Sequence, residues 1–167
     1  MPDVVIRPPK PDDAEGLALA ARDLAEQYAA REPERFQIPE QDALIAALRA
    51  TLQAPLPQNS IWLVAEFADE AVGDAYAQLH EPSADAGVQP QRDVGRRRVH
   101  LDYLAVQASH RGQGIGSRLL SAVEEWAREN GAELISTDTN LRSNEGAVEF
   151  YERHGYEQQA VILRKPL

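Results

Sequence analysis

Cysteine is absent from this sequence of 167 residues. The chain therefore forms no disulfide and no thiolate metal site, and an acyl group that it transfers cannot pass through a cysteinyl thioester. Long hydrophobic runs are absent as well: no segment approaches the roughly 18 apolar residues of a membrane-spanning helix, and no basic start precedes an apolar core. We therefore expect a cytoplasmic protein with no membrane partner.

Length and charge narrow the class further. A chain of this length suits one domain, 1–167, with a buried core. The net charge is −10, and acidic residues outnumber basic ones by 16 to 6 over residues 1–90, against 11 to 11 over residues 91–167. This balance disfavours nucleic acid as a partner. The basic run Arg96–Arg98 is short and has no accompanying aromatic residues, so we expect a solvated strand start there.

Hydrophobic periodicity predicts alternating strands and helices. Strands are expected at residues 4–7, 61–67, 71–79, 97–106, 133–137 and 156–164, and helices at residues 12–29, 39–52, 114–129 and 143–154. The short turn at residues 68–70 predicts a hairpin, and the prolines and glycines of residues 81–95 predict a flexible loop. No domain linker, internal repeat or low-complexity segment interrupts the pattern.

A glycine-rich segment, Arg111–Ser117, follows the apolar run Val99–Val106 and opens a helical pattern. A helix N-terminus carries unpaired N–H groups and about half a positive charge, and glycines let an anion approach the backbone closely. The segment therefore predicts a phosphate cradle, although a plain glycine-rich turn would show the same residues. In a cradle the backbone N–H groups of residues 112–117 would point at the phosphate oxygens, and Ser117 would add a hydroxyl.

A second segment favours the cradle. Asn144, Ala147, Tyr151 and Gly155 fit the pattern N-x-x-A-x-x-x-Y-x-x-x-G, while Arg111, Gly114 and Gly116 fit R/Q-x-x-G-x-G/A. With both patterns at this separation, the chain resembles the GNAT superfamily, the acetyl-CoA-dependent N-acetyltransferases. The opening residues 6–14 are similar to that family's first strand and helix start. The resemblance thus runs from the N-terminus to the last strand and is weakest between residues 29 and 95.

The resemblance implies an α/β (α+β) fold. We expect a single domain whose mixed, mostly antiparallel sheet is flanked by helices and splays apart between its fourth strand, ending at Val106, and its fifth, at residues 134–137. Acetyl-CoA would enter that gap as the co-substrate. The residues expected to bind it are Leu104, Ala105, Val106, Arg111, Gly112, Gln113, Gly114, Ile115, Gly116, Ser117, Asn144 and Tyr151.

Each part of acetyl-CoA needs a different partner. The pyrophosphate suits the glycine segment, where Arg111 could either pair with a phosphate or hold the loop in shape. The pantetheine amides can bond like a peptide strand, and the resemblance places them along the backbone of residues 104–106. The N–H of Leu104 could also polarise the thioester carbonyl. Asn144 could hold a polar group of the pantetheine or of the phosphate end.

Tyr151 is the candidate general acid. A phenol with a pKa near 10 can protonate the departing CoA thiolate. The alternative is packing, because Tyr151 would share a helix face with Ala147 and Val148.

His100 and Asp102 are the candidate general bases. In a regular strand they alternate on the same face as Leu104 and Val106, so their side chains should point together. Some members of the resembling family carry a histidine or a glutamate at one of these places, acting directly or through water. Alternatively, His100 is a polar residue at a strand edge and Asp102 an ion-pair partner of a neighbouring arginine.

The predicted function is acetyl transfer from acetyl-CoA to a primary amine by direct attack in a ternary complex. The acceptor would be a small-molecule or peptide amine. Because the first half of the chain supplies most of the acceptor side in the resembling family, its acidity favours a cationic amine. A homodimer would be in keeping with that family.

Two alternative functions would show different properties. A non-catalytic acyl-CoA-binding sensor would keep the glycine segment but release no free thiol. A Rossmann dinucleotide site fits poorly, because five residues separate the strand from Gly112, where a Rossmann turn is tight, and Ser117 stands at the last position of its motif. The four histidines lack metal-ligand spacing, so no metal is expected.

Overall fold

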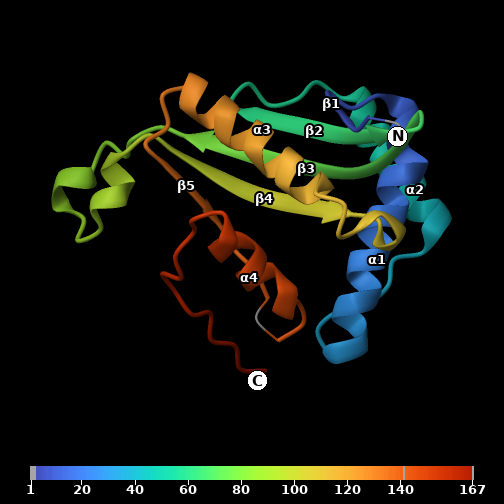
Figure 1. The fold of residues 1–167 in the computed structure, drawn as a ribbon. Helices are drawn as coiled ribbons and strands as arrows, with labels where there is room; N and C mark the ends of the chain where they lie inside the picture. The colour runs from blue at the N-terminus through green and yellow to red at the C-terminus, as the bar shows by residue number, and fades with distance from the viewer. Residues whose placement is uncertain (1–2, 141, 167) are drawn as a thin grey trace.

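Five strands form one sheet in the computed structural model, which describes residues 3–140 and 142–166 (Figure 1). The strands, in their order across the sheet, are β1 (Val5–Arg7), β2 (Ser60–Phe67), β3 (Glu70–His80), β4 (Arg98–Val106) and β5 (Leu134–Thr137). Neighbouring strands are antiparallel except β4 and β5, which are parallel. The mixed, mostly antiparallel sheet is therefore confirmed.

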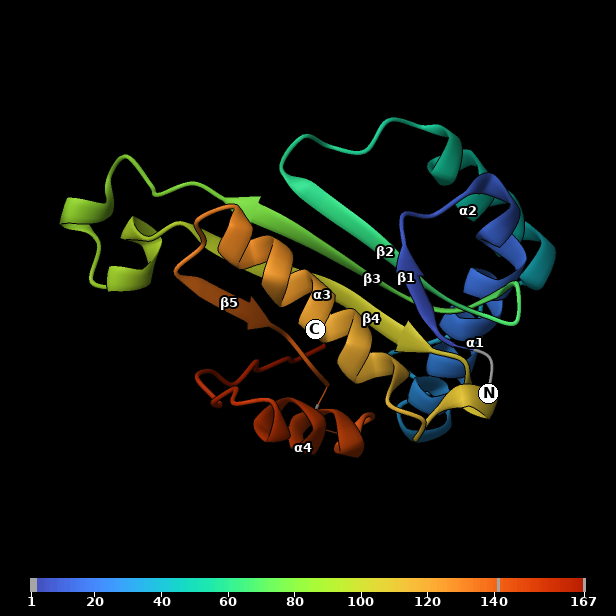
Figure 2. The same cartoon turned by 45° about the horizontal axis from the view of Figure 1, so that its top comes forward.

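Four helices flank the sheet: α1 (Ala14–Arg31), α2 (Gln41–Gln53), α3 (Ile115–Glu129) and α4 (Glu145–Arg153). Figures 1 and 2 show α3 lying across one face of the sheet and α4 beside β5, while α1 and α2 are grouped together. The expected helices are thus all present, with ends that differ from the prediction by at most two residues. Residues 81–95, expected to be a loop, contain two short 3₁₀ helices.

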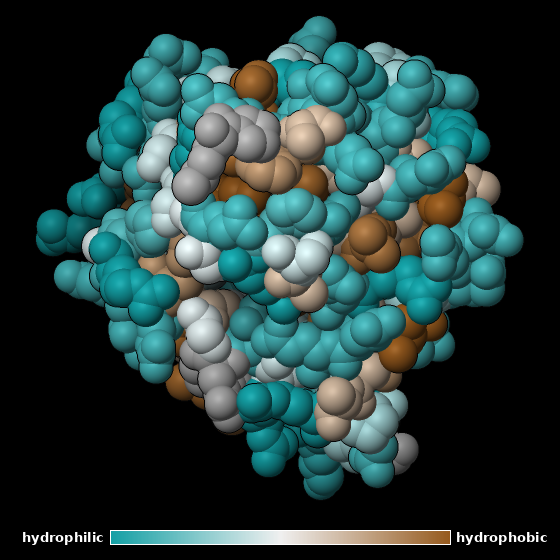
Figure 3. All heavy atoms as spheres, turned by 45° about the vertical axis from the view of Figure 1, so that its right-hand side comes forward, coloured by the Kyte–Doolittle hydropathy of each residue, from teal (hydrophilic) through white to brown (hydrophobic). Residues whose placement is uncertain are grey.

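The two faces of the sheet carry separate apolar clusters, because successive residues of a strand point to opposite sides. On β2, Ala65 belongs to the larger cluster, which α3 completes, whereas Val64 packs with Leu17 of α1. The buried residues of α3 recur at helical spacing: Ile115, Leu119, Leu120, Val123 and Ala127. Outside these clusters the surface is largely hydrophilic, with separate hydrophobic patches on the face drawn in Figure 3.

The predicted hairpin joins β2 to β3 through a two-residue turn at Ala68 and Asp69. Both residues have positive φ, 51° and 65°. Two successive left-handed residues make a type I′ turn, whose twist matches that of the flanking strands. The tertiary pairing therefore imposes on alanine a conformation that usually favours glycine or asparagine.

Helix α1 approaches β3 unusually closely at Gly16. A Cβ atom built there would lie 2.1 Å from the carbonyl oxygen of Ala71. The buried side-chain amide of Gln107 completes this contact, since it donates to the carbonyl oxygens of Gly16 (3.1 Å) and Ala71 (2.9 Å). Only glycine fits at the contact, which fixes α1 against the sheet.

An ion-pair network ties the first strand to the start of α1. Arg7 donates through Nε to Glu66 (2.7 Å) and through its terminal nitrogens to both carboxylate oxygens of Asp13 (2.7 and 2.8 Å). The same Asp13 carboxylate accepts the backbone N–H of Lys10. Asp13 is the N-cap residue of α1, but its side chain caps no N–H of the helix and instead holds the preceding turn.

The strand predicted at residues 156–164 is wrong. Helix α4 ends in a Schellman motif, in which Gly155 has a φ of 85° and the N–H of Tyr156 donates to the carbonyl of Tyr151. The chain then continues without pairing to any described strand. Three of its apolar side chains are exposed: Val161 (73%), Ile162 (72%) and Leu163 (90%). Apolar β-branched residues favour a strand only where a partner strand receives them.

Candidate active site

The sheet opens between β4 and β5. The two strands pair only from Arg98 with Leu134 to Leu101 with Thr137. Beyond that point residues 102–106 of β4 have no strand on this side within the described part of the chain. The predicted splay is therefore confirmed, and it leaves one edge of β4 with unpaired backbone groups, as a ligand with amide groups requires.

Two glycines shape the segment between β4 and α3. Gly112 and Gly114 have φ values of 76° and 79°, and Gly114 is the N-cap of α3. The first N–H groups of α3, from Ile115 onward, have no acceptor within the helix and carry its positive end. This arrangement can hold an anion, and it lies directly beyond the free edge of β4.

Arg111 holds this segment in shape. Its Nε donates to the carbonyl oxygen of Val106 (2.9 Å), and a terminal nitrogen donates to the side chain of Gln27 on α1 (3.1 Å). Of the two roles that the sequence left open for Arg111, the hydrogen bonds match the structural one. They join the end of β4 to α1 across the mouth of the opening.

The start of α3 touches α4. A Cβ at Gly116 would lie 3.6 Å from the ring of Phe150 and 3.7 Å from the side chain of Leu104. The hydroxyl of Ser117 lies 3.0 Å from Nε2 of His154, whose Nδ1 lies 2.7 Å from the carbonyl of Phe150. Nδ1 must therefore carry the proton, so the Ser117 hydroxyl donates to Nε2. Only the backbone N–H of Ser117 is then left to act as a donor toward an anion.

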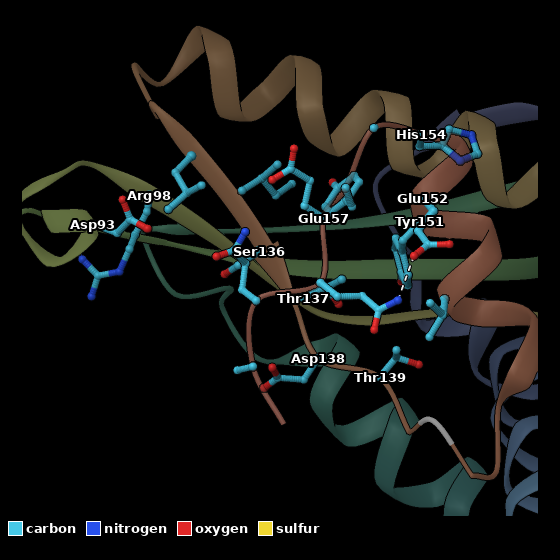
Figure 4. A pocket seen from close by; sticks show the side chains of 18 of the residues that line it. Asp93, Arg98, Ser136, Thr137, Asp138, Thr139, Tyr151, Glu152, His154 and Glu157 are labelled. Carbon is cyan, nitrogen blue, oxygen red and sulfur yellow. Dashed lines mark hydrogen bonds between the residues drawn. The ribbon is translucent and has the colours of Figure 1, made fainter. Parts of the chain in front are cut away.

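Tyr151 lies at the point where the sheet divides. Figure 4 shows it in the same cleft as Thr137, whose hydroxyl donates to the carbonyl of Leu101 (2.9 Å) at the last pair between β4 and β5. Burial raises the pKa of Tyr151, and the hydroxyl of Thr137 offsets part of this rise. The phenol therefore stays protonated over the neutral range, which suits a proton donor.

Asn144, just before α4, faces α1. Its amide nitrogen donates to the hydroxyl of Tyr28 (3.3 Å), and its oxygen accepts from Gln27 (3.2 Å). Because Gln27 also binds Arg111, this one glutamine connects the start of α4 with the glycine segment. Asn144 thus lies at the opening, but its side chain is hydrogen-bonded to residues of α1.

The expected alignment of His100 and Asp102 is wrong. The register between β3 and β4 pairs Tyr76 with Tyr103 and Ala77 with Leu101, so Asp102 is the extra residue of a β-bulge. The bulge reverses the alternation, and His100 shares its face with Tyr103 instead of Leu104. Neither periodicity nor composition indicates a bulge of one residue.

The surroundings of the two candidate bases differ. His100 bonds through Nδ1 to the hydroxyl of Ser136 (3.1 Å), and its Nε2 lies 3.9 Å from Asp138. Asp102 is exposed at the division of the sheet. The ion pair suggested for Asp102 does not form with Arg97, whose guanidinium binds Glu81.

A buried carboxylate on β3 was not among the residues predicted for the site. Asp74 is 3% exposed and accepts a hydrogen bond at Oδ2 from the indole of Trp62 (2.9 Å), while its Oδ1 has no partner. Burial raises the pKa of Asp74 to about 7, although the indole hydrogen bond lowers it in part. A single aspartate inside the apolar run Ala71–Leu79 was the available signal.

A hollow of about 1300 Å³ lies beside β5. It is bounded by α4 and by residues 155–164, and it reaches Thr137 and Tyr151 (Figure 4). The glycine segment is not among its walls. Within residues 3–140 and 142–166 no three acidic or histidine side chains cluster as metal ligands would, and no helix is long and apolar enough to cross a membrane.

Comparisons with known proteins match this architecture. The sequence profile of the Acetyltransferase (GNAT) family matches residues 20–156. An uncharacterized N-acetyltransferase, YhfO of Bacillus subtilis, is 31% identical over 92% of this chain and 89% of its own. Aminoalkylphosphonate N-acetyltransferase of Salmonella typhimurium is 45% identical, but over 40% of this chain and 43% of its own length.

A solved structure extends the match to the fold. The aminoglycoside N-acetyltransferase AAC(6')-Iy, in complex with CoA, superposes with a TM-score of 0.63 over 100% of this chain and 97% of its own, at 21% identity. At this identity the likeness shows the fold alone.

Proposed function

This chain belongs to the acetyltransferase (GNAT) family, and on that premise we propose that it moves an acetyl group from acetyl-CoA to a primary amine by direct attack in a ternary complex. One observation carries the proposal: a free strand edge, an anion-binding helix start and a buried phenol border the same opening. These are the three partners that the arm, the pyrophosphate and the leaving thiolate of acetyl-CoA require.

The cofactor residues have distinct parts in this proposal. The N–H groups of residues 112–117 receive the pyrophosphate, and Arg111 keeps their segment in place. The pantetheine amides pair with the free edge of β4 at residues 104–106. The N–H of Leu104 contributes about 3 kcal/mol of stabilisation if it is aligned with the carbonyl oxygen of the thioester as negative charge develops there.

Proton transfers follow from the groups at the division of the sheet. A base, His100 or Asp102 acting directly or through water, removes one proton from the ammonium so that its nitrogen can attack the thioester carbon. As the carbon–sulfur bond breaks, Tyr151 donates its proton to the sulfur. The second proton of the attacking nitrogen is released and restores the phenol. With no cysteine in the chain, no thioester to the enzyme is formed.

The names of two similar proteins support the proposed class of acceptor. One acts on aminoalkylphosphonates and another on aminoglycosides, and both kinds of compound carry amines. A primary amine is the group that they share.

A pair of variants at Gly116 tests the cradle. The Cβ of alanine would meet only ordinary contacts at this position, so Gly116→Ala controls for side-chain volume, whereas Gly116→Glu adds a negative charge beside the pyrophosphate. Calorimetry with acetyl-CoA should show binding to the natural chain and to Gly116→Ala, and none to Gly116→Glu. Equal binding by both variants would remove the assignment.

Turnover is tested separately. Release of free thiol from acetyl-CoA, followed against a broad panel of primary amines, should exceed the release in the absence of amine. Binding of acetyl-CoA without thiol release from any amine would favour the non-catalytic sensor.

A further inference from the structure

The buried carboxylate of Asp74 belongs to a group of aromatic residues on the acceptor side of the sheet. Asp74 is in register with Val64 on β2 and Ala105 on β4, so it shares the face that α1 covers. Three half-buried rings lie on the same face: Trp62, Tyr76 and Tyr103. The rings of Trp62 and Tyr76 meet edge to face, with 6.2 Å between their centroids.

Asp74 acts electrostatically on its aromatic neighbours. Burial raises the pKa of Tyr103, and the negative charge of Asp74 and the phenol of Tyr28 raise it further. Tyr28 has the same effect on the pKa of Tyr151. Tyr103 thus lies within electrostatic reach of Asp74 and Tyr28, and Tyr151 lies within electrostatic reach of Tyr28.

A purely structural role does not account for the burial of the Asp74 carboxylate. An unpaired acceptor buried in a protein costs about 1–3 kcal/mol, and the single indole donor satisfies only one of its two oxygens. A carboxylate beside aromatic rings has a familiar use, because a cation over a ring face is attracted by the ring and by any negative charge nearby. The excess of acidic residues in this half of the chain acts in the same direction.

We propose that Trp62, Tyr76 and Tyr103 form the surface on which the acceptor binds as an ammonium cation, with Asp74, which accepts the indole N–H of Trp62, as its counter-charge. This inference rests on the proposed function, and it narrows the acceptor to amines that are protonated when they bind. Asp74 is a positioning residue: it attracts the cation to these rings, and it does not touch the reacting atoms.

A cation that cannot be acetylated separates binding from turnover. Benzyltrimethylammonium carries a permanent charge, so its dissociation constant can be measured by calorimetry from pH 5.5 to 8.5 without interference from its own titration. The natural chain should bind it more tightly as the pH rises through about 7, where Asp74 becomes ionised. Asp74→Asn, which keeps an oxygen for the indole of Trp62, should bind about tenfold more weakly at pH 8 and with no such pH dependence.

A second variant should shift the pH dependence of benzyltrimethylammonium binding instead of abolishing it. Trp62→Phe removes the indole donor that lowers the pKa of Asp74, so the midpoint of the binding profile should move to higher pH. The other groups that face Asp74 or Tyr103 are Tyr28, Arg111 and, on the same face of β4, His100. His100→Gln should retain the midpoint of the natural chain, because ionisation of Asp74 sets that midpoint.

Two amines extend the test to turnover. Benzylamine is protonated at neutral pH, whereas aniline is not. Asp74→Asn should raise KM for benzylamine about tenfold, change kcat little and leave aniline unaffected. Equal binding of benzyltrimethylammonium by the natural chain and Asp74→Asn, or no binding by either, would overturn the inference. Because calorimetry needs no turnover, this outcome is distinct from a failure of the amine panel, which would overturn the proposed function.

Discussion

Tyr151 is the residue whose surroundings most closely match one chemical task. It is packed against Phe150 and Tyr156, with ring centroids 5.1 and 5.3 Å apart, so its hydroxyl is held in one place beside Thr137. Tyr151→Phe keeps this packing and removes only the proton. Turnover should fall by about 100-fold, the lower end of the 10²–10⁴-fold that a positioned general acid typically contributes.

Two measurements accompany this change. Affinity for acetyl-CoA should stay within about twofold, since the ring still fills its site. The turnover of the natural chain should not decline on the alkaline side until well above neutrality, because burial raises the pKa of Tyr151. An unchanged rate in Tyr151→Phe would assign the proton donor to another group.

Asp13 provides a residue-scale test of stability. Burial acts to raise the pKa of its carboxyl, but the hydrogen bonds from Arg7 and from the N–H of Lys10 outweigh it and leave the pKa below its usual value. A carboxyl of this kind stabilises the folded state above its unfolded pKa of about 3.9, and the contribution is lost as the pH falls through the lower folded-state value.

Asp13→Asn should therefore lower the free energy of unfolding by about 1–3 kcal/mol at pH 7. Urea denaturation at pH 7 and at pH 3 measures the effect. The difference between the two proteins should shrink at the lower pH, and a constant difference would show that the charge is not its source.

The sequence predicted a glycine segment at the start of a helix, and the structure has one before α3. Gly112 and Gly114 adopt the left-handed conformations that a glycine segment before a helix suggests. Side-chain partners were less accessible, since the bond of Arg111 to Gln27 depends on how α1 packs beside the glycine segment, and that of Ser117 to His154 on how α3 and α4 approach each other. The bulge at Asp102 belongs to the same class, because pairing with β3 creates it.

At the scale of secondary-structure elements, the packing of α1 on β3 depends on Gly16. Gly16→Ala would force a Cβ against the carbonyl oxygen of Ala71, and backbone cannot rotate aside as a side chain does. We expect a loss of at least about 1–3 kcal/mol in the free energy of unfolding. Thermal and urea denaturation measure it.

Helix α4 offers the matched control. A Cβ at Gly146 would meet nothing within 4 Å, so Gly146→Ala should be neutral or should stabilise the protein by up to about 1 kcal/mol through helix propensity. Equal effects of the two substitutions would contradict the close contact at Gly16.

The elements themselves followed from periodicity where each has a partner. The amphipathic stripe of α3 and the hairpin of β2 and β3 are as predicted, because apolar spacing and a short turn are local signals. Residues 156–164 carry an equally apolar pattern, yet the Schellman motif at Gly155 sends them away from the sheet. A local pattern cannot show whether a partner strand is within reach.

At the scale of the whole molecule, acetyl-CoA should act as a stabiliser. A ligand that binds only the folded state adds about 2.7 kcal/mol at 100 times its Kd. For a chain of this size each kcal/mol corresponds to roughly 2–4 °C in Tm. Differential scanning fluorimetry should therefore show a rise that Gly116→Ala shares and Gly116→Glu lacks. A rise in all three proteins would place the ligand elsewhere.

The edge of β4 that β5 leaves uncovered also allows the binding of acetyl-CoA to be measured directly. Main-chain amides of residues 102–106 that point away from β3 exchange their hydrogens with water at a rate set by what lies against them. Deuterium uptake in a peptide spanning these residues would measure the fraction of molecules that have bound acetyl-CoA, without an assay of the product. The same amides would thus report how much of the protein has bound the acetyl donor in the presence and in the absence of an acceptor.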